Sequence, residues 1–366
     1  MKIGALVVSI ALLGVTQSGF TATEGGFKRF SVSAGWLHVM PQGKANPFNI
    51  NTAVANGTVS KVGSISEGSF INAIDSNFTM NDFNVKEQLK ELEKLDAFRQ
   101  IGISDADRNI IERESGTAVI NGLDSWRSGG TGLEADNVDT LGLTVNYYLN
   151  DNVSLQLIGG IPPKVDIKGK GEIYAPLFGK ATPTGTAGML FPDGLDLKQD
   201  ILITNLGAQS KVATARAWTP VLEAQYQFGK SGVNKFRPYI GAGIMYAYFN
   251  DIKLNSQINT DLIAAGHMIQ NVLDNKAGAA LDGKVSSGVM RVDVDADDAI
   301  APVFTAGFTY DLNENWYGVA SVSYAKLSNE TTINVVNETT GAELIHATAK
   351  IDIDPLITYL GVGYRF

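Results

Sequence analysis

The sequence predicts an all-β fold: an eight-stranded antiparallel transmembrane β-barrel with long extracellular loops containing short helices. Three observations carry this prediction. Several segments alternate apolar and polar residues, as a strand does when one face meets lipid and the other meets a lumen. Short turns alternate with long connections along the chain, which is typical of such barrels. The N-terminus carries a short apolar stretch of the kind found in exported proteins.

The clearest pair of strands is a hairpin around the turn Asn150-Asp151-Asn152. Before this turn, residues 141–149 place Leu, Val or Tyr at every second position, and residues 153–157 continue the alternation after it. Asn and Asp are common turn residues, so the segment predicts a tight hairpin. The pattern recurs around 229–235 and 313–315. We expect strands at 27–40, 141–149, 153–157, 221–228, 236–250, 304–312, 316–324 and 351–366.

The spacing of these strands gives the barrel two unlike ends. Three short turns alternate with four long connections, at 41–137, 164–216, 251–300 and 329–350, and the first is a large insertion. Aromatic residues near the strand ends suit interfacial girdles. These are Tyr147, Tyr148, Phe228, Phe236, Tyr248, Phe249, Tyr310, Trp316 and Tyr317. A soluble β-sandwich or lipocalin-like barrel is the alternative, but the polar faces carry small uncharged residues more than Lys and Glu.

The first residues read as a secretory signal peptide. Lys2 precedes an apolar run over 3–15, followed by small and polar residues to 23. The run is too short to span a bilayer as a helix, which takes roughly 20 residues. We expect a signal peptide at 1–22 and the barrel at 23–366; an N-terminal core helix is the alternative. The formal net charge of −9 argues against a nucleic-acid partner, because phosphate binding needs a basic face.

The long connections contain two helical patterns. Residues 84–100 place Val85, Leu89 and Leu92 at helical spacing, with Asn81 or Asp82 as a candidate cap, and residues 259–275 form a second pattern. We expect these helices to pack over the barrel mouth; a membrane-lying or partner-binding role is the alternative. Residues 291–298 (RVDVDADD) are interpreted as an acidic loop, because they lack the glycine and distal glutamate of a calcium-binding EF-hand.

No catalytic motif accompanies this pattern. The three histidines, His38, His267 and His346, are far apart in the sequence. The chain lacks Gly-x-Ser-x-Gly, His-Glu-x-x-His and phosphate-binding glycine loops. We therefore expect no enzyme activity, no catalytic residues, no cofactor and no bound metal.

Several segments resemble the outer-membrane protein W (OmpW) family. The most specific are KFRPYIGAG at 235–243 and GVGYRF at 361–366, supported by Ala34-Gly35, by 141–155, by 220–228 and by Trp316. The resemblance implies an outer-membrane location and passive uptake of small hydrophobic or amphipathic molecules, with lateral release into the bilayer. Val362, Tyr364 and Phe366 resemble the C-terminal signal that outer-membrane proteins present to the barrel assembly machinery.

Strand parity then selects candidate residues for the lumen. The interior of an eight-stranded barrel is just wide enough for side chains to fill, which excludes a wide pore. The lumen-facing candidates for transport are Gly142, Asn146, Gln156, Glu223, Gln225, Gly241 and Gly243. The expected partners are outer-membrane lipid and lipopolysaccharide, the barrel assembly machinery and small apolar solutes. The alternative is a structural or receptor barrel whose loops serve adhesion, or phage or toxin docking.

Overall fold

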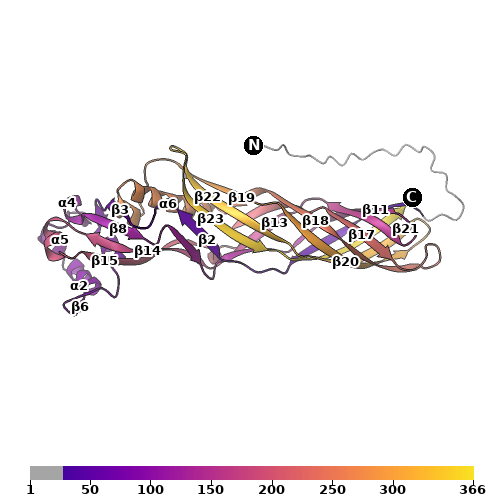
Figure 1. Ribbon diagram of the computed structural model, residues 1–366, viewed down its shortest axis with the longest axis horizontal. Coiled ribbons are helices and arrows are strands. Elements are labelled where there is room, and N and C mark those ends of the chain that lie inside the picture. Colours follow the sequence, from indigo (N-terminus) through magenta and orange to yellow (C-terminus); the bar gives the residue numbers. More distant parts are fainter. Residues whose placement is uncertain (1–27) are drawn as a thin grey trace.

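The computed structural model describes residues 28–366 and shows an elongated molecule, with a barrel at one end and a head of strands and helices at the other (Figure 1). The predicted signal peptide at 1–22 lies outside the described residues. No helix within 28–366 is long and apolar enough to cross a bilayer.

The predicted eight-stranded antiparallel barrel is confirmed. Neighbouring strands pair in the order β1-β11-β12-β17-β18-β20-β21-β24, and β24 pairs with β1 to close the wall. The strands are β1 (Phe30–Pro41), β11 (Val138–Tyr148), β12 (Val153–Gly160), β17 (Val221–Gln227), β18 (Phe236–Leu254), β20 (Ala299–Asp311), β21 (Trp316–Ala325) and β24 (Pro355–Arg365). Closure gives each of the eight strands a paired neighbour on both sides, as a lipid environment requires.

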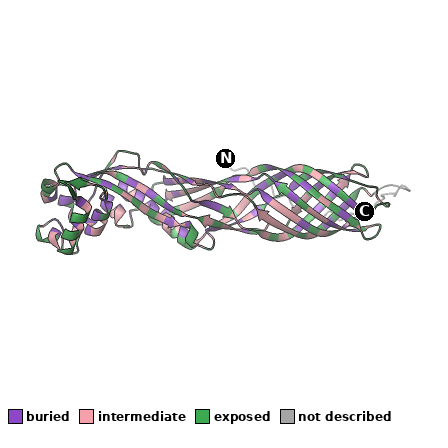
Figure 2. Cartoon of the chain, turned by 90° about the horizontal axis from the view of Figure 1, so that it is seen from below, coloured by how far each residue is buried: buried purple, intermediate pink, exposed green. Residues whose placement is uncertain are grey.

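The barrel has an apolar exterior. Exposed and buried residues alternate along its strands (Figure 2), as in β17, where Leu222 is 51% exposed and Glu223 is 1% exposed. Near the short turns, exposed rings of Phe228, Phe236, Tyr310 and Trp316 form an aromatic girdle. Three rings that the sequence placed in the girdle point inward instead.

The three misplaced rings are Tyr148 and Tyr317, which are 5% and 1% exposed inside the barrel, and Phe249, which packs against buried residues of the interior. The hydroxyl of Tyr317 lies 3.0 Å from Ser31 Oγ within the lumen. Proximity to a strand end did not decide their position, because the period of two along the strand fixes the face that each residue occupies.

The four long connections form a head that contains short helices, as predicted, and also many strands. Its strands make further sheets beyond the barrel. Strands β10 (Gly132–Ala135), β13 (Lys164–Lys170) and β16 (Ala213–Trp218) continue the barrel sheet outward along β18. A four-stranded sheet contains β3 (Thr58–Lys61), β8 (Thr117–Asn121), β14 (Glu172–Thr182) and β15 (Leu195–Asn205). A five-stranded sheet contains β2 (Phe48–Thr52), β9 (Ser125–Ser128), β19 (Met290–Ala296), β22 (Ser328–Asn337) and β23 (Ala342–Asp352). Two short pairs join β4 (Ile65–Ser66) to β7 (Asn109–Ile110) and β5 (Thr79–Met80) to β6 (Phe83–Asn84).

Strand β19 overturns the interpretation of residues 291–298 as an acidic loop. Its residues pair with β22, from Met290 opposite Asn337 to Ala296 opposite Thr331. The alternation of Val and Asp in this segment is the period of a strand, and the acidic residues obscured it.

Both helical patterns form helices. The first becomes α2 (Val85–Lys94) and α3 (Ala97–Gln100), and the second becomes α6 (Ser256–Leu273). Asn84, rather than Asn81 or Asp82, caps α2 through its side chain. Asn81 and Asp82 have positive φ and instead form the turn between β5 and β6. The other helices are α1 (Glu67–Ala73), α4 (Glu112–Ser115), α5 (Gly185–Leu190), α7 (Ala277–Leu281) and a 3-10 turn at Leu206–Ala208.

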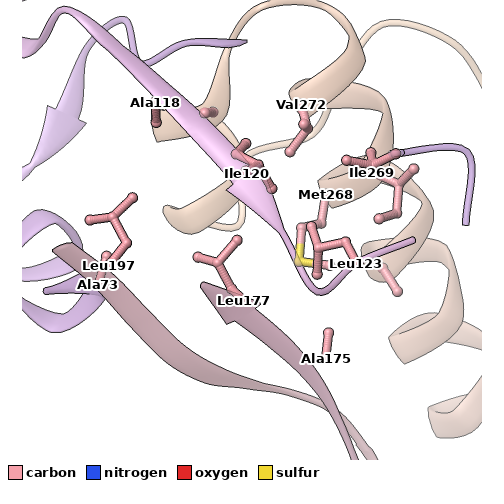
Figure 3. Close-up of a cluster of buried hydrophobic side chains, with 14 of the residues drawn as sticks. Ala73, Ala118, Ile120, Leu123, Ala175, Leu177, Leu197, Met268, Ile269 and Val272 are labelled. Carbon is pink, nitrogen blue, oxygen red and sulfur yellow. The ribbon is translucent and has the colours of Figure 1, made fainter. Parts of the chain in front are cut away.

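The head has its own hydrophobic core. Ile120 of β8, Leu177 of β14 and Leu197 of β15 lie on one face of the four-stranded sheet, across from Ile269 and Val272 of α6 (Figure 3). These residues come from three of the four long connections, and Leu344, at 0% exposure, adds the fourth. The head is therefore one packed unit rather than four independent loops.

Candidate functional site: the barrel lumen and its wall

The structure places all seven lumen candidates on the inward side of the wall. Asn146, Gln156, Glu223 and Gln225 are each at most 6% exposed. Glycine has no side chain, so the surroundings of these three positions are described by the atoms that an added Cβ atom would approach. At Gly142 it would lie 3.0 Å from Tyr359, and at Gly241 it would lie 3.0 Å from Glu223 Oε1. At Gly243 it would lie 2.1 Å from the carbonyl oxygen of Leu222, so a larger residue would force the strands apart.

The half of the lumen nearer the short turns is filled by hydrogen-bonded side chains, which we call the polar layer. Its residues are Ser33, Thr144, Asn146, Gln156, Glu223, Gln225, Gln227, Thr305, Thr309 and Ser323, with the rings of Tyr239, Tyr317 and Tyr359. Gln225 donates to Gln156 Oε1 at 2.7 Å and to Glu223 Oε1 at 2.5 Å. Thr305 donates to Glu223 Oε2 at 2.7 Å. Four of the predicted residues therefore lie within this layer, three of them in one hydrogen-bonded group.

Buried charges close the end of the lumen nearest the turns. Arg365 donates to Asp311 Oδ1 at 2.6 Å and lies over the ring of Tyr317, 4.3 Å from its centroid. Arg237 is 2% exposed and donates to the carbonyl oxygen of Asp151 at 2.5 Å. Guanidinium groups suit such sites because they offer several donors in a fixed plane. These side chains therefore fill the end of the lumen nearest the short turns.

An apolar layer lies between the polar layer and the head. It consists of Val221, Met245, Ala247, Ala301, Val303, Ala325 and Leu327, each at most 3% exposed. Ile158 and Phe249 pack against it from the wall. Sequence reasoning missed this layer, although strand parity could have found it: Met245 and Ala247 share a face with the predicted Gly241 and Gly243.

The wall beside the apolar layer is interrupted. Paired residues between β12 and β17 end at Ile158 and Val221, and pairing resumes between β13 and β16 at Lys164 and Arg216. We call the intervening backbone, 159–162 facing 218–220, the seam. Pro162 and Pro220 have no N–H group to donate across it. Ile158 packs against the apolar layer and Val221 is part of it, so the seam lies beside that layer. Within the seam, the guanidinium of Arg216 donates to the carbonyl oxygen of Pro162 at 3.3 Å.

Exposed apolar rings and chains border the seam on the outside. Ile161 is 57% exposed, Trp218 is 44% exposed and Tyr248, paired with Trp218, is 39% exposed. Aromatic side chains of this kind favour the membrane interface. The seam therefore lies near the outer edge of the membrane-facing band.

The three histidines have separate surroundings. His38 Nδ1 lies 2.7 Å from Asp139 Oδ1, and His346 Nδ1 lies 2.8 Å from Asn334 Oδ1. His267 Nδ1 lies 2.9 Å from the buried Ser286 Oγ, and burial lowers the pKa of His267. Within residues 28–366 no cluster of three or more His, Cys, Asp or Glu side chains offers a metal site.

The residues of the C-terminal motif face outward on β24. Val362 is 50% exposed and Phe366 is 64% exposed. The ring of Tyr364 lies 5.1 Å from those of Trp316 and Phe366, so the three rings form a row on the membrane-facing surface.

Comparison with known proteins places the barrel among outer-membrane proteins. A family model described as the OmpW family matches residues 194–285 and 282–366. Outer membrane protein W of Vibrio cholerae is 24% identical over 237 residues, which are 64% of this chain and 76% of that protein. Outer membrane protein AlkL of Ectopseudomonas oleovorans is 22% identical over 230 residues, 63% of this chain and 67% of that protein. The crystal structure of OprG from Pseudomonas aeruginosa aligns with 93% of this chain and 98% of its own, at 17% identity and a TM-score of 0.47.

The closed wall, apolar exterior and filled lumen define an eight-stranded outer-membrane β-barrel, and the relatives are outer-membrane proteins. The matches to the OmpW family model and to outer membrane protein W support the OmpW family assignment that the strand segments predicted.

Proposed function

We propose that this protein gives small hydrophobic or amphipathic molecules a passive, non-catalytic route past the lipopolysaccharide into the outer membrane. In this proposal a molecule enters beside the head, reaches the apolar layer and leaves sideways through the seam. The observation that carries it is the position of the seam directly beside the apolar layer, at Ile158 and Val221.

Two features of the lumen favour a lateral route over an axial one. The polar layer surrounds a cavity of about 10 Å³ and is otherwise joined by hydrogen bonds, which a solute would have to break to pass along the axis. An apolar solute also gains nothing from that network, because it would leave buried polar groups unpaired. The apolar layer and the lipid outside the seam offer it similar surroundings. Lateral release therefore requires displacement of few polar groups.

The seven inward residues are assigned to this function as the floor of the route. Glu223, Gln225 and Gln156 would block passage below the apolar layer, and Gly241 and Gly243 would let β17 and β18 approach closely. Small apolar solutes and the surrounding lipid and lipopolysaccharide are the partners that this proposal requires.

The test is uptake of an apolar dye or a medium-chain alkane by cells that produce the protein, compared with cells lacking it, in an intact lipopolysaccharide background. We expect production to raise uptake several-fold. Ile158→Asn adds a polar group where the apolar layer meets the seam and should abolish most of the gain, whereas Ile158→Leu should keep it. Equal amounts of folded barrel in the membrane, shown by heat-dependent gel mobility, make the two variants comparable.

A specific observation favours the second candidate, a receptor or docking barrel. The outward face of the four-stranded head sheet exposes Val59 at 61%, Phe178 at 50% and Leu202 at 52%, and carries a groove of about 660 Å³. Exposed apolar patches of this kind mark interaction surfaces. If production of the protein leaves the uptake of several apolar and amphipathic solutes unchanged, the transport proposal fails and docking through the head becomes the better account.

A further inference from the structure

Two buried oxygens of the polar layer lack a hydrogen-bond partner. They are Asn146 Oδ1 and Gln227 Oε1, from side chains that are 5% and 3% exposed. Most of the surrounding polar side chains are paired, including Ser33 with Thr144 at 2.7 Å and Thr305 with Ser323 at 2.8 Å. Buried polar groups in folded proteins are nearly always satisfied, so two such oxygens in one layer require an explanation.

The contacts of Gln227 fix which end of its amide is the oxygen. Its Nε2 donates to Thr309 Oγ1 at 2.6 Å and approaches the carbonyl oxygen of Arg237 at 3.4 Å. A flipped amide would set its oxygen against that carbonyl oxygen, which cannot donate. Oε1 of Gln227 therefore needs a donor from elsewhere.

Both orphan oxygens belong to side chains that line the same small cavity. Its volume is about 10 Å³, and its walls also include Thr144, Tyr148 and Gln156. A cavity holds one water molecule when it offers about one water-sized sphere and two to four polar partners. The volume of this cavity is about that of one such sphere, and both orphan oxygens belong to residues on its wall.

The chemistry of the cavity favours water over a cation. A hard cation takes about six or more oxygen ligands in its coordination shell, more room than this cavity has. Glu223 is the carboxylate nearest in the network, because it accepts from Gln225, which lines the cavity. Both of its oxygens already accept a hydrogen bond. Water needs only acceptors for its two protons, and the two amide oxygens supply them.

We propose that the barrel lumen holds one resident water molecule, which donates to Asn146 Oδ1 and Gln227 Oε1. This water joins β11 to β17, the two strands that flank β12, within the polar layer. Its site is a fixed part of the fold and does not depend on whether solutes use the seam.

The direct test is a crystal structure of the full-length mature protein at a resolution that shows other buried waters. We expect a density peak within hydrogen-bond distance, roughly 2.6–3.2 Å, of both oxygens. An empty cavity would overturn the proposal. An anomalous signal at the peak in crystals soaked in rubidium chloride would also overturn it, in favour of a monovalent cation.

A double-mutant cycle gives an independent test that tolerates partly destabilised variants. If one water joins the two side chains, Asn146→Ala and Gln227→Ala should each lower the urea midpoint, and the double variant should lose clearly less than the sum. As a matched control, Asn146→Ala and Ser323→Ala should be additive, because Ser323 pairs with Thr305 and does not line the cavity. If both cycles are equally additive, no shared water joins Asn146 to Gln227. If either single variant raises the midpoint, the lost oxygen was unsatisfied and the cavity is dry.

Discussion

At the scale of single residues, Glu67 shows how the head tolerates a charge in its interior. The carboxylate is 1% exposed, yet Ser104 donates to Oε1 at 2.5 Å and Arg108 donates to Oε2 at 2.8 and 3.0 Å. Arg108 reaches this position from a backbone with φ of 61°, so the ion pair holds an uncommon conformation in place. A buried charge is stable only with partners of this kind.

Glu67→Gln should weaken the head while leaving the barrel intact. The amide keeps the shape but loses the charge-assisted hydrogen bonds, which we expect to cost about 1–3 kcal/mol. Hydrogen exchange should show faster opening of α1 and of 104–110, with no change in β17 or β21. Glu91→Gln is the control, because the Glu91–Lys94 pair is solvent-exposed and should not affect exchange. Unchanged exchange in the Glu67 variant would show that Arg108 does not need the carboxylate.

At the scale of elements, the barrel strands followed from the sequence and the head strands did not. Each barrel strand turns one face to the lumen and the other to lipid, so apolar and polar residues alternate along the strand itself. The strand can therefore be recognised from its own residues. Strand β2 gains its partners from β9 and from β23, almost 300 residues away, and no local pattern reports such pairing. Strand β14 contains Pro176, which argues against a central strand. The structure accommodates it because β8 pairs with β14 only from Phe178 onward.

Part of the candidate site could likewise be predicted from the sequence, and part could not. Parity placed Asn146, Gln156, Glu223 and Gln225 inside the wall because a strand's period of two needs no tertiary information. The seam could not be predicted, because it depends on where one ladder ends and another begins. Pro162, Pro163 and Pro220 were visible in the sequence, but only the register shows that they meet beside the apolar layer.

The last strand, β24, allows a test of the proposed assembly signal. Phe366→Ser should lower the amount of barrel assembled in the outer membrane several-fold. The folded barrel should be little affected, because the ring is 64% exposed and contacts mainly Tyr364. Phe236→Ser is the matched control, a 55% exposed ring at the same end of the barrel on β18. Heat-dependent gel mobility of membrane fractions measures both. An equal loss in the two variants would assign Phe366 to the aromatic girdle rather than to a signal.

At the scale of the whole molecule, the head and the barrel differ in how their parts depend on one another. The barrel is closed by its own eight strands. The head core combines Ile74 from the first connection, Leu195 from the second, Ile269 from the third and Leu344 from the fourth, all fully buried. Removing one connection would expose the apolar surface of the other three, at roughly 25 cal/mol for each Å² returned to water. The head should therefore lose its structure as a unit.

Replacing residues 44–134 with a short Gly/Ser linker tests this dependence. We expect proteases added to intact cells to cut the variant within α6, whose Ile258, Ile269 and Val272 are buried in the shared core of the full-length protein. The eight barrel strands should stay resistant, because lipid and the polar layer hold them independently of the head. A Gly-Ser insertion at the exposed turn 338–341 is the control and should leave the pattern unchanged. If α6 resists cleavage without the first connection, the core is divisible, and each connection stabilises its own part of the head.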